Sequence, residues 1–250
     1  MSQDLNYPGG KVRLFVKADL SQRAQVPLSN SQAHYLLNVM RARVGSRARL
    51  FNGRDGEWVA TVREVGRKSA LLSCEERTGP QVDVPDVWLL FAPIKRTPAD
   101  YVAQKATELG VRTLQPVLTR RTIVKRVNID RLRANAIEAA EQSGRVTVPV
   151  VLSPRQLPDV LAQWDRERLL IFCDEGCDAK PIAKSLADRH SAPCAILTGP
   201  EGGFDSDERE QLRGLPFVLP IALGARILRA DTAALAALAV WQSLKGDWEH

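Results

Sequence analysis

Two glycine-rich loops, each placed directly after a short apolar run, constrain the fold of this chain more than any other feature of its sequence. The first loop is Leu197–Phe204 (Leu-Thr-Gly-Pro-Glu-Gly-Gly-Phe) and the second is Ile221–Thr232 (Ile-Ala-Leu-Gly-Ala-Arg-Ile-Leu-Arg-Ala-Asp-Thr). The preceding runs, Cys194–Leu197 and Phe217–Ile221, are typical of buried strands. Open α/β sheets bind ligands at the carboxyl ends of their strands, so we expect the two loops to leave neighbouring strands and to share one binding site.

The glycines of the first loop allow two interpretations. Gly199, Gly202 and Gly203 let the backbone approach a ligand closely, and they also suit a tight connection between a strand and a helix. Asp205 followed by Glu208 predicts a capping box that opens the next helix. The loops lack the G-x-G-x-x-G pattern of dinucleotide sites and the G-K-[ST] of a phosphate loop, which disfavours a nicotinamide cofactor and ATP.

Length and composition favour a globular protein. The chain has 250 residues, of which 44% are hydrophobic, enough for one large or two modest domains with packed cores. No apolar run approaches the eighteen or so residues of a membrane span, and the first ten residues are polar. We therefore expect a soluble, cytoplasmic protein with no membrane partner.

Cysteine and histidine spacing raises the question of a metal. Cys173 and Cys177, followed by His190 and Cys194, loosely resemble a zinc site in their spacing. Cys194 lies within an apolar run, where a free cysteine behaves as a small hydrophobe, and a helix is predicted at 181–189 between the two pairs. We expect no metal.

The net charge of +6 is confined to the first third of the chain. Residues 1–79 hold 13 Lys and Arg against 7 Asp and Glu, whereas residues 80–250 hold 22 of each. This asymmetry favours an N-terminal module that binds a polyanion, beside a neutral C-terminal domain, although a basic surface without a ligand also fits.

The N-terminal region reads as a small β domain. Short strands are predicted at 12–16, 47–51, 57–63 and 69–73, with turns at Asn52-Gly53, Asp55-Gly56 and Gly66. Asn30 is the predicted N-cap of a short helix that carries Leu36, Leu37 and Met40. Several short strands in fewer than eighty residues are typical of a small barrel.

The pattern changes after a predicted linker at 78–85. Strands are expected at 87–92, 114–118, 148–152, 169–172 and before the two glycine loops, and they alternate with helices at 97–109, 131–143, 157–164, 181–189, after Asp205 and at 232–245. Six strands that alternate with six helices predict an α/β fold in which a mostly parallel sheet is covered on both faces.

The paired loops resemble those of the knotted (SPOUT) RNA methyltransferases. Leu197–Phe204 together with Leu223–Ala233 is most similar to the family that methylates N3 of a uridine in 16S ribosomal RNA. Further matches are His34–Arg43, Lys95-Arg96, Gln104–Val111 and Glu138–Arg145. The resemblance implies an N-terminal PUA-like β-barrel (1–79) that binds RNA, a C-terminal trefoil-knotted methyltransferase domain (80–250), S-adenosylmethionine as cofactor, and a homodimer that acts on ribosomal RNA of the small subunit.

The same resemblance implies site residues. Those for the cofactor are Leu197, Thr198, Gly199, Pro200, Glu201, Gly202, Ile221, Leu223, Gly224, Ile227, Leu228 and Ala230. Those for RNA are Arg13, His34, Arg41, Arg43, Arg54, Lys95 and Arg145.

The chemistry of uridine N3 suggests two catalytic groups. N3 carries a proton that must leave before the nitrogen attacks, so Glu201 is the candidate proton acceptor and Arg229 the candidate cation beside the uridine anion. Alternatively, Glu201 bonds amides of its own loop and Arg229 pairs with Asp231. The family more often has Thr-Glu where this chain has Ala230-Asp231, and Asp231 also fits as the N-cap of the last helix.

Two other functions stay open from the sequence. A ribose 2′-O-methyltransferase of the same superfamily would alter the sugar instead of the base. A non-catalytic ribosome-assembly factor would use the glycine loops only as structure, and it would not bind S-adenosylmethionine.

Overall fold

The computed structural model describes residues 10–94, 96–124, 126–175, 179–189 and 193–248. These residues form two compact units. The first unit contains the chain up to Asp83 together with Ala140–Val148, and the second contains Val84–Ala139 and the chain from Pro149 onward. No helix in the described part of the chain is both long and apolar enough to cross a membrane.

The first unit is built on a five-stranded sheet with the order β1-β3-β4-β5-β2. Its strands are β1 (Arg13–Phe15), β2 (Gln25–Pro27), β3 (Arg47–Phe51), β4 (Glu57–Val65) and β5 (Ala70–Gly79). All pairs are antiparallel except β1 with β3. In β4, residues 59–62 are all buried, because side chains cover both faces of the strand there. The small N-terminal β domain predicted from the sequence is confirmed.

The helix of this unit begins one residue earlier than predicted. Ser29, not Asn30, is the N-cap of α1 (Asn30–His34), because its hydroxyl accepts from the amide of Gln32 while the Gln32 side chain accepts from the amide of Ser29. The helix continues as a π-helical turn, η1 (Tyr35–Val39). Such turns are rare, and they occur often at functional sites.

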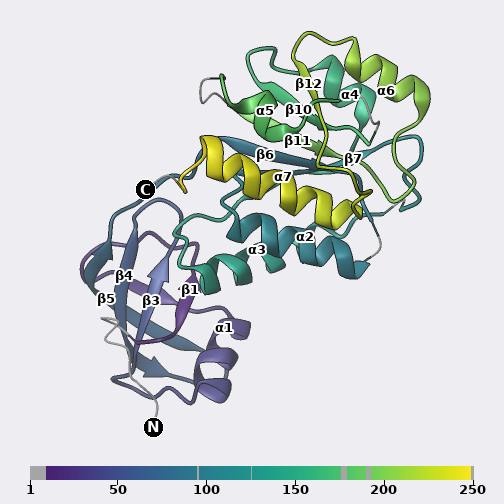
Figure 1. Ribbon diagram of the computed structural model, residues 1–250. Coiled ribbons are helices and arrows are strands. Elements are labelled where there is room, and N and C mark those ends of the chain that lie inside the picture. The colour runs from purple at the N-terminus through teal and green to yellow at the C-terminus, as the bar shows by residue number, and fades with distance from the viewer. Residues whose placement is uncertain (1–9, 95, 125, 176–178, 190–192, 249–250) are drawn as a thin grey trace. The chain divides into compact units, whose positions relative to one another are not determined.

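The second unit is built on a parallel sheet with the order β12-β10-β11-β6-β7-β8, to which β9 adds by pairing with β7 (Figure 1). The strands are β6 (Val87–Phe91), β7 (Thr113–Leu118), β8 (Val150–Val151), β9 (Arg155–Gln156), β10 (Leu169–Cys173), β11 (Cys194–Thr198) and β12 (Val218–Ile221). All of these strand pairs are parallel, as predicted from the alternation of strands and helices.

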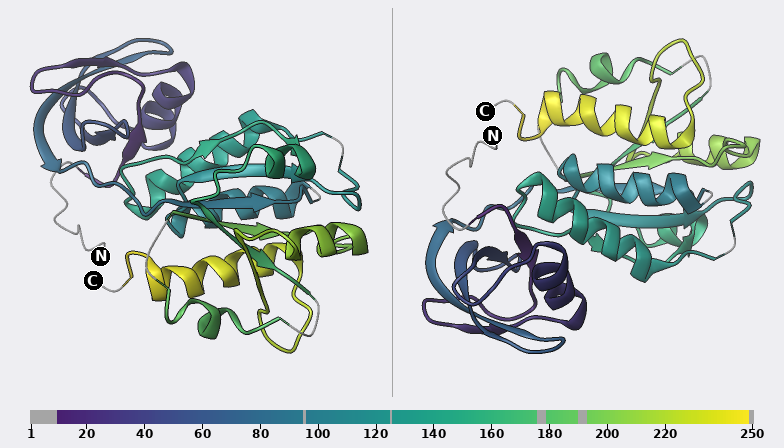
Figure 2. Two further views of the ribbon diagram at one scale, coloured as in Figure 1. Left: turned by 90° about the horizontal axis from the view of Figure 1, so that it is seen from above. Right: turned by 90° about the horizontal axis from the view of Figure 1, so that it is seen from below.

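Helices cover both faces of this sheet. One face packs on α2 (Arg96–Glu108), α3 (Ile129–Ser143), α5 (Ile182–Leu186) and α7 (Ala230–Lys245), and the other packs on α4 (Leu157–Ala162) and α6 (Ser206–Arg213). Successive side chains of β6 point to opposite faces of the sheet. Leu89 packs in the core beneath α2, α3, α5 and α7, and Leu90 packs in the core beneath α4 and α6. Figure 2 shows α2 lying between α3 and α7. The trefoil knot implied by the resemblance stays a prediction.

Candidate active site

The two glycine loops lie at the carboxyl edge of the parallel sheet, where the sequence predicted them. Thr198, the last residue of β11, is in register with Phe91 of β6, and Ile221, the last residue of β12, is in register with Cys173 of β10. The prediction that the loops leave neighbouring strands is wrong, because β10 lies between β11 and β12. Both edges of β11 are occupied, by β10 and β6, so β12 pairs with the remaining edge of β10.

Strand β10 therefore contributes a third loop to the same edge, and the sequence analysis missed it. Asp174 is 3% exposed and forms ion pairs with Arg209 (2.9 Å) and Arg213 (2.6 Å) of α6. Glu175 is exposed, and its carboxylate lies against the Cα atom of Gly203 in the first glycine loop. The signal was available, because two acids follow directly on the apolar run that ends at Cys173.

Gly199 serves packing within the first glycine loop. A Cβ atom at this position would lie 2.6 Å from the Phe204 ring, which is 3% exposed. That ring meets Phe172 edge to face, with their centroids 4.9 Å apart. The close approach of the Gly199 backbone to Phe204 thus fixes the loop on the strand below it.

Replacing Gly199 with alanine is expected to lower the free energy of unfolding by about 1–3 kcal/mol, because the added methyl group must displace a packed ring. Gly202→Ala is the matched control, since a Cβ atom there meets only Arg121 at 3.8 Å, an ordinary contact. Denaturant titration of both variants measures the difference. Equal destabilisation of the two variants would show that the contact with Phe204 is not the reason why position 199 requires a glycine.

The segment after β7 clamps the first glycine loop. Arg121 donates to the carbonyl oxygen of Gly202 at 3.1 Å, and Arg120 forms 2.7 Å ion pairs with Asp205 and Asp207. The backbone amide of Arg120 also donates to Glu208 at 2.8 Å. Asp205 and Glu208 form the capping box of α6 predicted from the sequence, which is therefore confirmed.

The second glycine loop exposes apolar side chains. Ile221 is buried and Leu223 and Leu228 are partly buried, whereas Ile227 is 90% exposed. Gly224 has a φ of 111°, in the region that favours glycine. These side chains fit a flat apolar ligand that would cover them, and the backbone amides and carbonyls of the first loop fit its polar edge.

The last helix begins earlier than predicted. Its N-cap is Arg229, whose backbone is extended and whose side chain makes no cap hydrogen bond. The predicted cap, Asp231, lies in the first helical turn, where its carboxylate accepts from the amide of Thr232 at 2.7 Å. The prediction failed because the chain already turns helical at Ala230. Asp231 still complements the positive end of the helix dipole.

The two predicted catalytic residues stand on the two glycine loops. Glu201 lies in the turn closed by the 3.0 Å bond from the Gly203 amide to the Pro200 carbonyl, and Arg229 ends the second loop. Both residues are exposed at the carboxyl edge of the sheet. Their roles stay predictions.

Three of the predicted RNA-binding residues cluster on the first unit. His34, at the end of α1, shares a 2.7 Å hydrogen bond between its Nδ1 and the Asn38 side chain. Arg41, with a φ of 57°, and Arg43 follow η1, and both are exposed. Tyr35 is 38% exposed beside them in the sequence. We call residues 34–43 the basic helix exit.

The other predicted RNA-binding residues lie elsewhere. Arg54 is half exposed and pairs with Asp19 at 2.7 Å. Arg145 donates from Nε to the Thr147 hydroxyl at 2.8 Å. Lys95 lies outside the described residues.

Arg13 is buried, and the structure favours a structural role for it over RNA contact. Its side chain is 4% exposed and pairs with Glu57 at 2.6 Å. Its guanidinium donates to the carbonyl oxygens of Ala140, Glu141 and Arg145, which belong to the same unit. Sequence analysis had no signal for these partners, because they lie more than 120 residues away in the chain.

Of the cysteines that raised the question of zinc, Cys194 is buried and Cys173 is partly buried. Burial raises the pKa of Cys173 and of Cys194 to about 12. Cys177 and His190 lie outside the described residues. Within the described residues, no three His, Cys, Asp or Glu side chains are grouped as metal ligands would be.

Family models match both halves of the chain. Residues 82–242, more than half of the sequence, match the family described as RNA methyltransferase domain. Residues 28–73 match the family described as RNA methyltransferase PUA domain.

Relatives match the chain almost from end to end. Ribosomal RNA small subunit methyltransferase E of Rickettsia conorii is 32% identical over 91% of this chain and 93% of its own length. The enzyme of the same name from Neisseria gonorrhoeae, solved with bound S-adenosylmethionine, has a TM-score of 0.83 at 29% identity and covers 95% of this chain and 99% of that chain. A Legionella pneumophila methyltransferase, solved with its cofactor S-adenosylmethionine, has a TM-score of 0.86 at 27% identity and covers 94% and 98%.

Proposed function

The chain belongs to the family of ribosomal RNA small subunit methyltransferases E, and on that premise we propose that it transfers a methyl group from S-adenosylmethionine to N3 of a uridine in 16S ribosomal RNA. The observation that carries the proposal is the similarity over nearly the whole chain to a structure that binds S-adenosylmethionine. The relatives' names support an rRNA methyltransferase. The choice of N3 of uridine rests on the resemblance of the two glycine loops.

The residues at the carboxyl edge fit the cofactor. We assign backbone groups of 198–202 to hydrogen bonds with the adenine and the ribose, and Leu223, Ile227 and Leu228 to the cover of the adenine ring. Ile227 supports this assignment, because an isoleucine that is 90% exposed gains from being covered. When bound, S-adenosylmethionine supplies a methyl group on a sulfonium, which is a good leaving group.

The protein must then orient the uridine and remove its N3 proton. We assign the removal of the N3 proton to the carboxylate of Glu201. The guanidinium of Arg229 then stabilises the resulting uridine anion. Both groups are exposed on the loops that would hold the cofactor. Because N3 lies on the pairing edge of the base, the uridine must be unpaired or extruded to reach them.

The basic helix exit of the first unit supplies affinity for the RNA backbone. Arginine forks bind phosphates in a bidentate manner, and phosphate contacts fix position without reading sequence. The excess positive charge of residues 1–79 supports this role. We assign Arg41 and Arg43 to phosphates, and we expect the enzyme to be a homodimer.

Replacing Arg41 or Arg43 with alanine is expected to weaken RNA binding and to reduce the slope of log K against log salt by about one unit for each phosphate that the variant no longer binds. Titrations of 16S rRNA at several salt concentrations measure the slope. Arg67→Ala is the matched control, because Arg67 is an exposed arginine on the turn between β4 and β5. Slopes equal to that of the control would remove Arg41 and Arg43 from the RNA interface.

The proposed function is tested by mapping modified nucleosides in 16S rRNA from cells with and without this protein. The expected result is the loss of one N3-methyluridine, restored when purified protein and S-adenosylmethionine are added to the unmodified subunits. A modified ribose in its place would identify a 2′-O-methyltransferase. Calorimetry that shows no binding of S-adenosylmethionine to the folded protein would indicate a non-catalytic assembly factor.

A further inference from the structure

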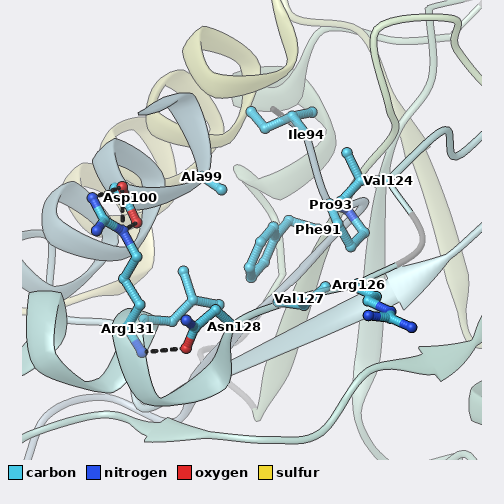
Figure 3. Close-up of a pocket in the computed structure, with 11 residues that line it drawn as sticks. Phe91, Pro93, Ile94, Ala99, Asp100, Val124, Arg126, Val127, Asn128 and Arg131 are labelled. Atoms are coloured by element: carbon cyan, nitrogen blue, oxygen red, sulfur yellow. Dashed lines mark hydrogen bonds and ion pairs between the residues drawn. The ribbon is translucent and has the colours of Figure 1, made fainter. Parts of the chain in front are cut away.

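A separate pocket lies in the second unit beside the candidate cofactor edge. Its volume is about 420 Å³, within the range of small-ligand sites. It lies between the end of β6, the first turns of α2 and α3, and the segment that leads into α3 (Figure 3). The residues that line it include Phe91, Pro93, Ala99, Val124, Arg126 and Arg131.

One wall of the pocket is polar and held rigid. The Asp100 carboxylate accepts a bifurcated hydrogen bond from Nε of Arg131, at 2.7 and 2.8 Å, and forms a 2.6 Å ion pair with Nη2 of the same guanidinium. It also accepts from the Asn135 side-chain amide at 2.9 Å. Asn128 accepts from the backbone amide of Arg131 at 2.9 Å and so fixes the start of α3. The planar guanidinium of Arg131 is therefore oriented before any ligand arrives, which lowers the entropic cost of binding.

The facing wall is apolar, and an exposed arginine is also among the lining residues. Figure 3 shows the Phe91 ring pointing into the space that separates the Asp100–Arg131 pair from Pro93 and Val124. Arg126, from the segment that leads into α3, is exposed. An apolar space with a hydrogen-bonded guanidinium on one side and a second, exposed arginine among its lining residues suits a planar ring attached to a phosphate.

The pocket is continuous with the edge that we assign to the cofactor. Phe91 is in register with Thr198 of β11, and the amide of Ala92 donates to the Thr198 carbonyl at 3.0 Å. The segment that carries Val124 and Arg126 begins at Arg120 and Arg121, which clamp the first glycine loop. A ligand in the pocket thus lies one strand away from the loop expected to hold the methyl donor.

We propose that this pocket receives an unpaired nucleobase of the substrate RNA, with the adjoining phosphate on Arg126. The base stacks against the guanidinium plane of Arg131 and is enclosed by the apolar wall. This inference rests on the proposed function, because it takes RNA as the substrate. It adds a second RNA contact in the methyltransferase unit, apart from the basic helix exit of the first unit.

Filling the pocket tests the proposal. Ala99→Leu adds three carbons to a lining residue on α2, where leucine suits a helix. The variant is expected to bind unmodified 16S rRNA about 10- to 100-fold more weakly, the range expected when one base no longer stacks, and to bind S-adenosylmethionine as the wild type does. Ala134→Leu is the matched control, because Ala134 is an exposed alanine on α3 that does not line the pocket.

The phosphate contact is tested separately by Arg126→Ala, with Arg166→Ala as its control on the exposed turn between α4 and β10. We expect only Arg126→Ala to lower the slope of log K against log salt, by about one unit.

Wild-type RNA affinity in folded Ala99→Leu protein would overturn the proposal. Loss of S-adenosylmethionine binding would assign the pocket to the cofactor instead, and a changed sedimentation coefficient would assign it to a second copy of the chain. Because RNA binding is measured directly, a wild-type protein that binds RNA without methylating it would contradict the proposed function and leave this test intact.

Discussion

Replacing Arg13 with methionine is expected to lower the free energy of unfolding of the first unit by about 3–5 kcal/mol. The arginine side chain is 4% exposed, and its guanidinium lies 4.6 Å from the centroid of the Phe51 ring. Without Arg13, the Glu57 carboxylate, which is 12% exposed, loses its closer ion-pair partner. It keeps the longer ion pair with Arg49, at 3.2 Å. The substitution also removes the donors from three backbone carbonyls. Hydrogen exchange of amides in β3 and β4 measures the change within this unit.

Two controls separate this effect from a general loss of charge. Arg54→Met removes a surface ion pair with Asp19 and should cost less than about 1 kcal/mol. Adding Glu57→Gln to Arg13→Met should recover part of the lost stability, because it removes the charge that the first change leaves without its closest partner. Equal protection factors in the Arg13 and Arg54 variants would contradict the structural role of Arg13.

The strands and helices were predictable because their signals are local. The parallel sheet followed from apolar runs that alternate with helical segments, and Asp205 with Glu208 marked the start of α6 correctly. The two errors at helix starts also have local causes. Serine and asparagine are both favoured at N-caps, so the sequence does not distinguish Ser29 from Asn30. Ser29 is the cap because its backbone is still extended, whereas Asn30 is already helical. Arg229 takes the cap position before Asp231 because its backbone is extended and the next residue is helical.

The order of the strands was not predictable from the same signals. Whether β12 pairs with β11 or with β10 depends on which strand edges are already paired. The apolar runs in the sequence do not indicate which strands are neighbours. The two acids of the third loop, Asp174 and Glu175, were visible in the sequence, but their place beside the first glycine loop follows only from this strand order. The role of Arg13 was missed because its partners at 140–145 are distant in the sequence, and the pocket around Phe91 and Arg131 was missed because it combines separate segments.

Glu201→Gln is expected to slow methylation of the uridine by about 10²- to 10⁴-fold, the usual contribution of a general base, without changing S-adenosylmethionine binding. Glutamine keeps the size and the hydrogen-bonding capacity of the side chain but cannot take the N3 proton. Single-turnover rates at saturating RNA and cofactor measure the step directly, and the deficit should narrow as the pH rises, because hydroxide in solution then removes the proton.

Two further variants decide whether the proton acceptor is Glu201 itself. Glu210→Gln, an exposed residue of α6, should keep the wild-type rate. Glu175→Gln tests a second carboxylate, which belongs to the loop after β10 and lies against Gly203 of the first glycine loop. If Glu175→Gln lost activity while Glu201→Gln kept it, the acceptor would belong to the loop after β10. The loop that separates the two glycine loops would then supply the base, and Glu201 would serve only the geometry of its own turn.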